Sequence, residues 1–185
     1  IEIAIDHADI ELVSRVVNSE RKSRDEASVG ALSAAVGRKN QKIINLLLSD
    51  GVERYASVDA IKKAIDTVCY PNYGNPKGVE ELRELISAYS NLVSDEAVTT
   101  LLFEHLCGAV ENGYVDLVEE LIRNGAPVDH RSGQVTWGNL LSSFFEMNPK
   151  DKILLALVDA GLDLSHPSAD RYRENIQKFL KRAKR

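Results

Sequence analysis

The apolar residues of this chain recur in a short stripe that fills positions i, i+1, i+4 and i+5. Two copies are clear in the sequence: Ile43, Ile44, Leu47 and Leu48, and later Leu117, Val118, Leu121 and Ile122. Adjacent apolar pairs one turn apart lie on the same side of an α-helix. Because such a stripe must be covered by a neighbouring element, the pattern predicts helices that pack against one another.

Each stripe belongs to a longer internal repeat. Leu32 and Ala35 precede the first stripe as Leu106 and Ala109 precede the second, at a separation of 74 residues. Sliding this template along the chain finds further copies, with equivalent positions at Val13, Ile44, Leu82, Val118 and Leu154. Their spacings of 31, 38, 36 and 36 residues are typical of a two-helix repeat. We predict five repeats, at about 1–27, 28–55, 56–93, 94–130 and 131–168, in one domain that spans 1–185.

Within each repeat we expect a short first helix, rich in small residues, and a second helix that carries the stripe. Small residues at 31–35 and 106–110 allow neighbouring helices to approach closely. Gly51, Gly125 and Gly161 follow second helices, where glycine readily adopts the left-handed conformation that ends a helix. Ile1 also matches Leu32, so the printed sequence is expected to start inside a first helix.

Residues 112–129, Asn-Gly-Tyr-Val-Asp-Leu-Val-Glu-Glu-Leu-Ile-Arg-Asn-Gly-Ala-Pro-Val-Asp, resemble an ankyrin repeat. Residues 31–53 follow the same order, and the other copies are degenerate. The resemblance implies an all-α solenoid of stacked helix-turn-helix units that binds partners on its concave side. The family's Thr-Pro-Leu-His start of the first helix is missing from all five copies, so its side-chain hydrogen bonds are not expected here.

The third repeat is interrupted between its two helices. Residues 69–78 contain two Pro and two Gly, so this segment is expected to form a loop rather than a helix. Tyr70 and Tyr73 make the loop a candidate contact surface, because inserted loops often carry function. A neutral insertion is the alternative, since surface loops lengthen at small thermodynamic cost.

The C-terminal segment differs from the rest of the chain in charge. Residues 171–185 hold seven basic residues and one acidic residue, whereas 1–170 hold 16 basic and 27 acidic residues. Apolar side chains recur there at helical spacing: Tyr172, Ile176, Phe179, Leu180 and Ala183. We predict an amphipathic helix at about 169–185 that caps the stack. A nucleic-acid contact or a nuclear address is the alternative for its basic end, but the acidic body disfavours a long polyanion.

The residues with reactive side chains are too scattered to predict a catalytic site. Cys69 and Cys107 occupy different axial positions on their helices, so we expect two free thiols. The four His, at 7, 105, 130 and 166, lack metal-ligand spacing. Acidic pairs such as Glu119–Glu120 are expected on solvated helix faces. We therefore predict no enzyme activity, no cofactor, no metal and no small-molecule substrate.

Composition says little about where in the cell the protein is located. The chain has no run of about 18 apolar residues, so no membrane span is expected. We predict a cytoplasmic protein that is a monomer before it meets its partner, while a removed N-terminal leader stays open.

The function that these expectations favour is non-catalytic binding of another protein. The resemblance implies contacts in the loops between repeats and at the adjoining ends of the first helices, and the candidates with suitable side chains are Arg21, Arg24, Arg38, Tyr55, Tyr70, Tyr73, Glu111, Asn112, His130, Arg131 and Trp137. Burial of Trp137 at a repeat junction and a solvated loop around Arg21 are the alternatives for those positions. An inhibitor or immunity-type protein of a partner enzyme is one form of this function. The competing hypothesis is the targeting arm of a larger enzyme or effector.

Overall fold

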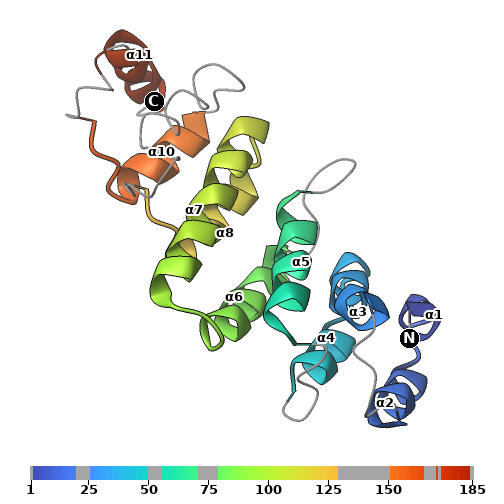
Figure 1. Ribbon diagram of the computed structural model, residues 1–185. Coiled ribbons are helices and arrows are strands. Elements are labelled where there is room, and N and C mark those ends of the chain that lie inside the picture. The colour runs from blue at the N-terminus through green and yellow to red at the C-terminus, as the bar shows by residue number, and fades with distance from the viewer. Residues whose placement is uncertain are drawn as a thin grey trace. The chain divides into compact units, whose positions relative to one another are not determined.

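The computed structural model describes residues 2–19, 26–49, 56–70, 79–128, 151–164, 170 and 172–183. All regular secondary structure in these ranges is helical, which confirms the all-α prediction for them (Figure 1). The chain divides into two compact halves, Ile1–Ser94 and Asp95–Arg185. That the five repeats form a single domain stays a prediction.

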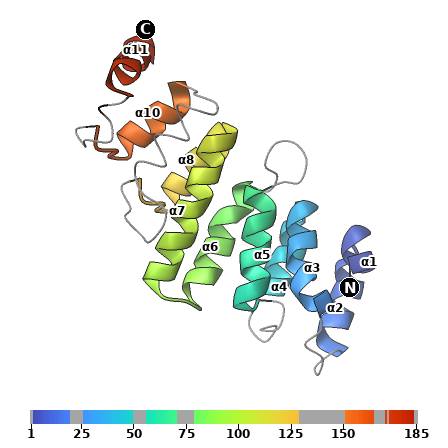
Figure 2. The ribbon, with the colours of Figure 1, turned by 45° about the horizontal axis from the view of Figure 1, so that its top comes forward.

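The N-terminal half consists of helix pairs. Its elements are α1 (Glu2–Asp6), α2 (Ile10–Ser19), α3 (Glu26–Gly37), α4 (Gln41–Leu48), α5 (Val58–Cys69), the 3-10 turn η1 (Val79–Glu81) and α6 (Leu82–Ser90). Each first helix packs on the second helix that follows it: α1 on α2, α3 on α4 and α5 on α6. The first helices also pack on one another, α1 on α3 and α3 on α5, as Figure 2 shows. Of the second helices, α2 packs on α4.

Small side chains bring the first helices of this half together. Ala31, Ala35, Ala60 and Ala64 are all fully buried in α3 and α5. Since alanine adds little bulk, two helices can approach closely at these positions. The predicted stripes of the second helices are buried as well: Ile43, Ile44 and Leu47 in α4, and Leu82, Leu85 and Ile86 in α6.

The C-terminal half contains α7 (Asp95–Asn112), α8 (Val115–Arg123), α10 (Asp151–Asp159) and α11 (Arg173–Ala183). In this half α7 packs on α8, α8 on α10, and α10 on α11. The stripes of α8 and α10 are buried: Leu117, Val118 and Leu121, then Ile153, Leu154 and Leu157.

The expected length of the first helices was wrong. α3 and α5 have 12 residues each and α7 has 18. α7 starts at Asp95, with Asp95 and Glu96 in a first turn where acidic side chains favour helix formation. No Gly or Pro follows before Gly108, so nothing in the sequence ends the helix early. α3 likewise starts at Glu26, before the small residues at 31–35 that marked the predicted first helix.

The same backbone turn joins the first and second helices of three pairs among the described residues. Ala8, Lys39 and Gly113 have positive φ angles of 54°, 54° and 69°. In each turn the next residue donates its N–H to a carbonyl five residues earlier, from Asp9 to Ala4 (2.9 Å), Asn40 to Ala35 (3.1 Å) and Tyr114 to Ala109 (2.9 Å). This is the Schellman arrangement that ends helices. The turns are 31 and 74 residues apart, the offsets of the apolar repeat, so the backbone repeats with the sequence. We call it the hairpin turn.

Glycine ends two second helices as predicted. Gly125 follows α8 with a φ of 88° and Gly161 follows α10 with a φ of 98°. The N–H groups of Ala126 and Leu162 then reach the carbonyls of Leu121 and Leu157 at 2.9 Å. Gly51 lies outside the described residues.

The C-terminal helix is amphipathic, as predicted. α11 starts at Arg173, later than the predicted residue 169, and packs on α10. Tyr172 and Ile176 are buried, and the guanidinium of Arg182 lies 4.7 Å from the ring centroid of Phe179. One basic side chain of this helix, that of Arg182, thus lies over an aromatic ring of the same helix, while the capping role stays a prediction.

Candidate functional site

Two of the predicted contact residues lie at one edge of the N-terminal half. Arg38 follows α3 and Tyr70 follows α5, and both side chains are exposed. Because α3 and α5 pack side by side with their C-terminal ends at the same edge, these positions belong to one surface (Figure 2). Tyr70 keeps its place through its N–H, which donates to the Asp66 carbonyl at 2.8 Å. We call this surface, with Arg38, Lys39 and Tyr70, the turn edge.

Lys39 links the turn edge to the next helix pair. Its ammonium lies 3.8 Å from the Glu80 carboxylate in η1. The side-chain amide of Gln41, close by at the start of α4, donates to the carboxylate of Glu84 in α6. Both contacts are exposed, so they contribute little to the free energy of unfolding. They do hold the carboxylates of Glu80 and Glu84 near the turn that follows Arg38.

In the C-terminal half, Glu111 and Asn112 form the last turn of α7 and are exposed. The Asn112 side-chain amide donates one N–H to the Gly108 carbonyl at 2.8 Å. That N–H is used within α7, and only the other polar atoms of the amide can contact a partner. Asn112 directly precedes the hairpin turn of α7 and α8, as Arg38 directly precedes that of α3 and α4.

The remaining predicted contact residues lie outside the described residues: Arg21, Arg24, Tyr55, Tyr73, His130, Arg131 and Trp137. Arg38, directly after α3, lies about 18 Å from the start of that helix at Glu26, because α3 has 12 residues.

The two thiols lie in environments that suppress their ionisation. Cys69, at the end of α5, and Cys107, in α7, are both buried and free. Burial, and then the nearby Asp66 carboxylate, raise the pKa of Cys69. Burial, with Glu111 and Glu104, raises the pKa of Cys107 to about 12. A thiolate nucleophile is therefore disfavoured at neutral pH at either position.

The described part of the chain shows no group of three or more His, Cys, Asp or Glu placed to hold a metal ion. None of its helices combines the length and apolar character that crossing a membrane requires.

One carboxylate occupies an apolar position of the repeat. Glu81 ends η1 at the site that Ile43 and Leu117 fill in other repeats, and it is only 6% exposed. Its Oε2 atom has no hydrogen-bond partner among the described residues. A buried polar atom without a partner costs free energy, so Glu81 is a strained feature of the third repeat.

Sequence reasoning missed a groove between α8 and α10. It has a volume of about 470 Å³, an apolar floor and a charged rim, and it is lined by Glu119, Ile122, Arg123, Lys152, Leu155, Ala156, Asp159 and Ala160. The signal was present in α10, where Lys152, Leu155, Ala156 and Asp159 follow the i, i+3, i+4, i+7 spacing of one helix face. Only the packing of α8 beside this face makes it one wall of a groove.

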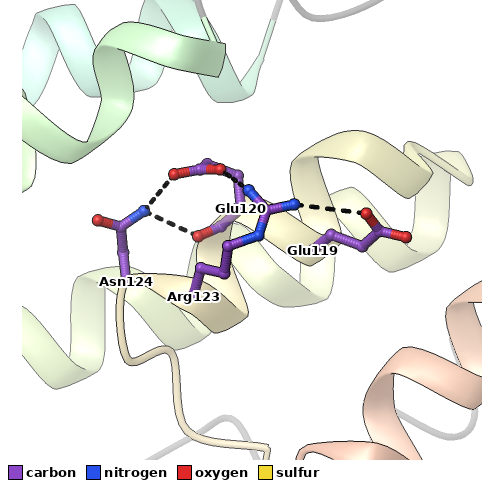
Figure 3. A network of polar contacts seen from close by, with 4 residues as sticks. All are labelled: Glu119, Glu120, Arg123 and Asn124. Carbon is purple, nitrogen blue, oxygen red and sulfur yellow. Dashed lines mark hydrogen bonds and ion pairs between the residues drawn. The ribbon is translucent and has the colours of Figure 1, made fainter.

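Two residues of the α8 wall, Glu119 and Arg123, belong to a polar network that is drawn in Figure 3. The Arg123 guanidinium pairs with the Glu120 carboxylate and lies 3.4 Å from that of Glu119. The Asn124 amide donates to the carbonyl and to the carboxylate of Glu120, both at 2.8 Å. Arg123 is thus engaged by carboxylates of its own helix.

Comparison of the chain with protein-family models, with curated proteins and with solved structures gave no significant match.

Proposed function

We propose that this chain is a non-catalytic protein-binding module built from ankyrin-like repeats. The observation that carries the proposal is the hairpin turn, which recurs at residues 8–9, 39–40 and 113–114 with the same hydrogen bonds. A backbone that repeats while its exposed side chains differ is a scaffold that presents variable contacts on a constant frame.

The turn edge is the surface that we assign to the partner in the N-terminal half. Arg38 and Tyr70 come from adjacent first helices and project where the helices end. Arg and Tyr are enriched among the residues that dominate interface energies, because each combines large contact area with polar atoms. Binding here favours a partner with an acidic group for Arg38 next to an apolar hollow for the Tyr70 ring.

Site-specific photo-crosslinking tests this assignment. A photoreactive amino acid replaces Tyr70 in one variant and Leu92, which is 50% exposed and outside the turn edge, in a control. The proposal expects one discrete protein adduct from position 70 and none from position 92, identified by mass spectrometry. Equal labelling from both positions, or none from position 70, contradicts it.

A charge reversal then measures the contribution of Arg38. For the partner identified by crosslinking, Arg38→Glu should weaken binding about tenfold or more, because it places like charges against each other. Arg83→Glu, an exposed change of the same sign in α6, is the matched control and should change affinity less than twofold. If the partner is an enzyme, its activity is measured in the complex. Lost activity indicates an inhibitor, and retained activity indicates a targeting arm.

A further inference from the structure

The groove between α8 and α10 carries two charges that have no partner among the described residues. Lys152 and Asp159 are exposed, and neither has an ion pair or hydrogen bond with another described residue. Both also oppose the helix dipole, since Lys152 is in the first turn of α10 and Asp159 is its last residue. Each placement costs a helix free energy rather than stabilising it. The two charges are therefore available to an external ligand.

The basic residue of the opposite wall, Arg123 of α8, does not pair with Asp159. Arg123 is already paired with Glu119 and Glu120 in the network of Figure 3. The groove consequently presents one available positive charge and one available negative charge on the same helix. Between them lie the half-buried side chains of Ile122, Leu155 and Ala156.

The spacing of the two charges is that of two helical turns. Lys152 and Asp159 are seven residues apart in α10, a rise of about 10 Å along the axis. A second α-helix repeats its side chains with the same period, so a residue and its seventh neighbour can meet both charges at once. Small-molecule sites bury most of their ligand, whereas Arg123, Lys152, Asp159 and Ala160 leave this groove exposed along its rim.

We propose that the groove binds an amphipathic helix of a partner protein. An acidic side chain of that helix pairs with Lys152, and a basic side chain two turns away pairs with Asp159. Apolar side chains between them pack on Ile122, Leu155 and Ala156. Helix-in-groove recognition of this kind uses apolar anchors for affinity and flanking charges for selectivity. The groove and the turn edge consist of different residues in different halves of the chain, so either assignment can fail alone.

Synthetic helical peptides test the proposal on the full chain. Three alanine-based probes carry two Leu on one face and differ in the two charged positions about seven residues apart. One has Glu and Lys, one has two Glu, and one has two Lys. Binding is followed by NMR titration of backbone amides. The wild-type chain should bind the mixed peptide about threefold to fivefold more tightly than the others, with shifts at residues 119–123 and 152–160.

Charge variants decide whether Lys152 and Asp159 set this preference. Lys152→Glu makes both charges negative and should switch the preference to the two-Lys peptide, whereas Asp159→Lys should switch it to the two-Glu peptide. Lys42→Glu is the matched control, because Lys42 is the second residue of α4 as Lys152 is of α10. It should leave the order of the three peptides unchanged. Leu155→Glu should abolish binding of all three by placing a charge on the groove floor.

Several outcomes would overturn the proposal. These are no binding of any peptide, an order of affinities that Lys152→Glu leaves unchanged, and an equal change in the Lys42→Glu control. Retained binding in Leu155→Glu, or shifts outside the groove, would show a different surface. Circular dichroism of each variant identifies any change that only unfolds the chain.

Discussion

The hairpin turn between α3 and α4 and the one between α7 and α8 share a backbone but are stabilised differently. In the first, Lys39 has a left-handed φ of 54°, and the Asn40 side chain accepts a hydrogen bond from the Ile43 N–H at 3.2 Å. In the second, Gly113 takes the left-handed position, and Tyr114 makes no side-chain cap. The turn at Asn40 has a side-chain cap for the helix that follows it. The turn at Gly113 has a glycine in the left-handed position that ends the helix before it.

The comparison shows that different residues form the same backbone turn. Asn40 and Tyr114 have nearly the same conformation, with φ and ψ of −94° and 84° against −85° and 84°. A left-handed Lys costs free energy that Gly avoids, and an Asn cap contributes free energy that Tyr cannot. The turn between α1 and α2 follows the first solution, with Ala8 left-handed and the Asp9 carboxylate accepting from the Leu12 N–H at 2.9 Å.

The third repeat departs from both solutions. Residues 71–78, outside the described ranges, separate α5 from η1 in the chain, and Glu81 occupies the first buried position of the stripe. The equivalent Ile43 and Leu117 are fully buried. The third repeat therefore tests how far the common turn and stripe determine stability.

The largest expected effect comes from restoring the stripe of the third repeat. Glu81→Leu should raise the free energy of unfolding by about 2 kcal/mol, because it removes a buried oxygen without a partner and adds apolar burial. Urea denaturation followed by circular dichroism measures the change. The neighbouring Glu80→Leu is the control, since Glu80 is exposed and should shift stability by less than about 0.5 kcal/mol. A loss of stability in Glu81→Leu would mean that the carboxylate has a stabilising contact.

The next effect is expected at the left-handed glycine of the C-terminal half. Gly113→Ala should lower the free energy of unfolding by about 1–2 kcal/mol, because φ is 69° there. Gly37→Ala, at the end of α3, is the matched control. A Cβ on Gly37 meets nothing within 4 Å, and no positive φ is recorded there, so alanine should be neutral or slightly stabilising. Equal effects of the two changes would argue against a conformational role for Gly113.

The cap of the N-terminal half should have a smaller effect. Asn40→Ala should cost about 1 kcal/mol through loss of the hydrogen bond to the Ile43 N–H. Asn40→Asp, which keeps an acceptor in place, should retain most of the stability. Amide hydrogen exchange of α4 measures both, and undiminished protection in Asn40→Ala would show that the cap is dispensable.

The smallest expected effect is relief of the left-handed lysine. Lys39→Gly should raise the free energy of unfolding by about 0.5 kcal/mol, since relief of backbone strain is partly offset by the entropy of glycine in the unfolded chain. Glu80→Gln removes the same ion pair without changing the turn, and separates the two contributions. A fall in stability for Lys39→Gly alone would show that the side chain contributes more than its conformation costs.

Much of the secondary structure followed from local patterns. The stripes at Ile43 and Leu117 predicted buried helix faces, and the glycines at 125 and 161 predicted helix ends. Both predictions are confirmed, because each signal depends only on a few neighbouring residues. The site was harder to predict. The groove between α8 and α10 was not predicted, since it depends on how two helices pack against each other.

The sequence by itself determined that the described part of this chain is helical and where several of its helices end, because apolar periodicity and left-handed turn residues act within one or two turns of backbone. Tertiary structure alone decided which surfaces those elements build. The packing of α3 on α5 brings Arg38 and Tyr70 to one edge, and the packing of α8 on α10 turns one helix face into a groove.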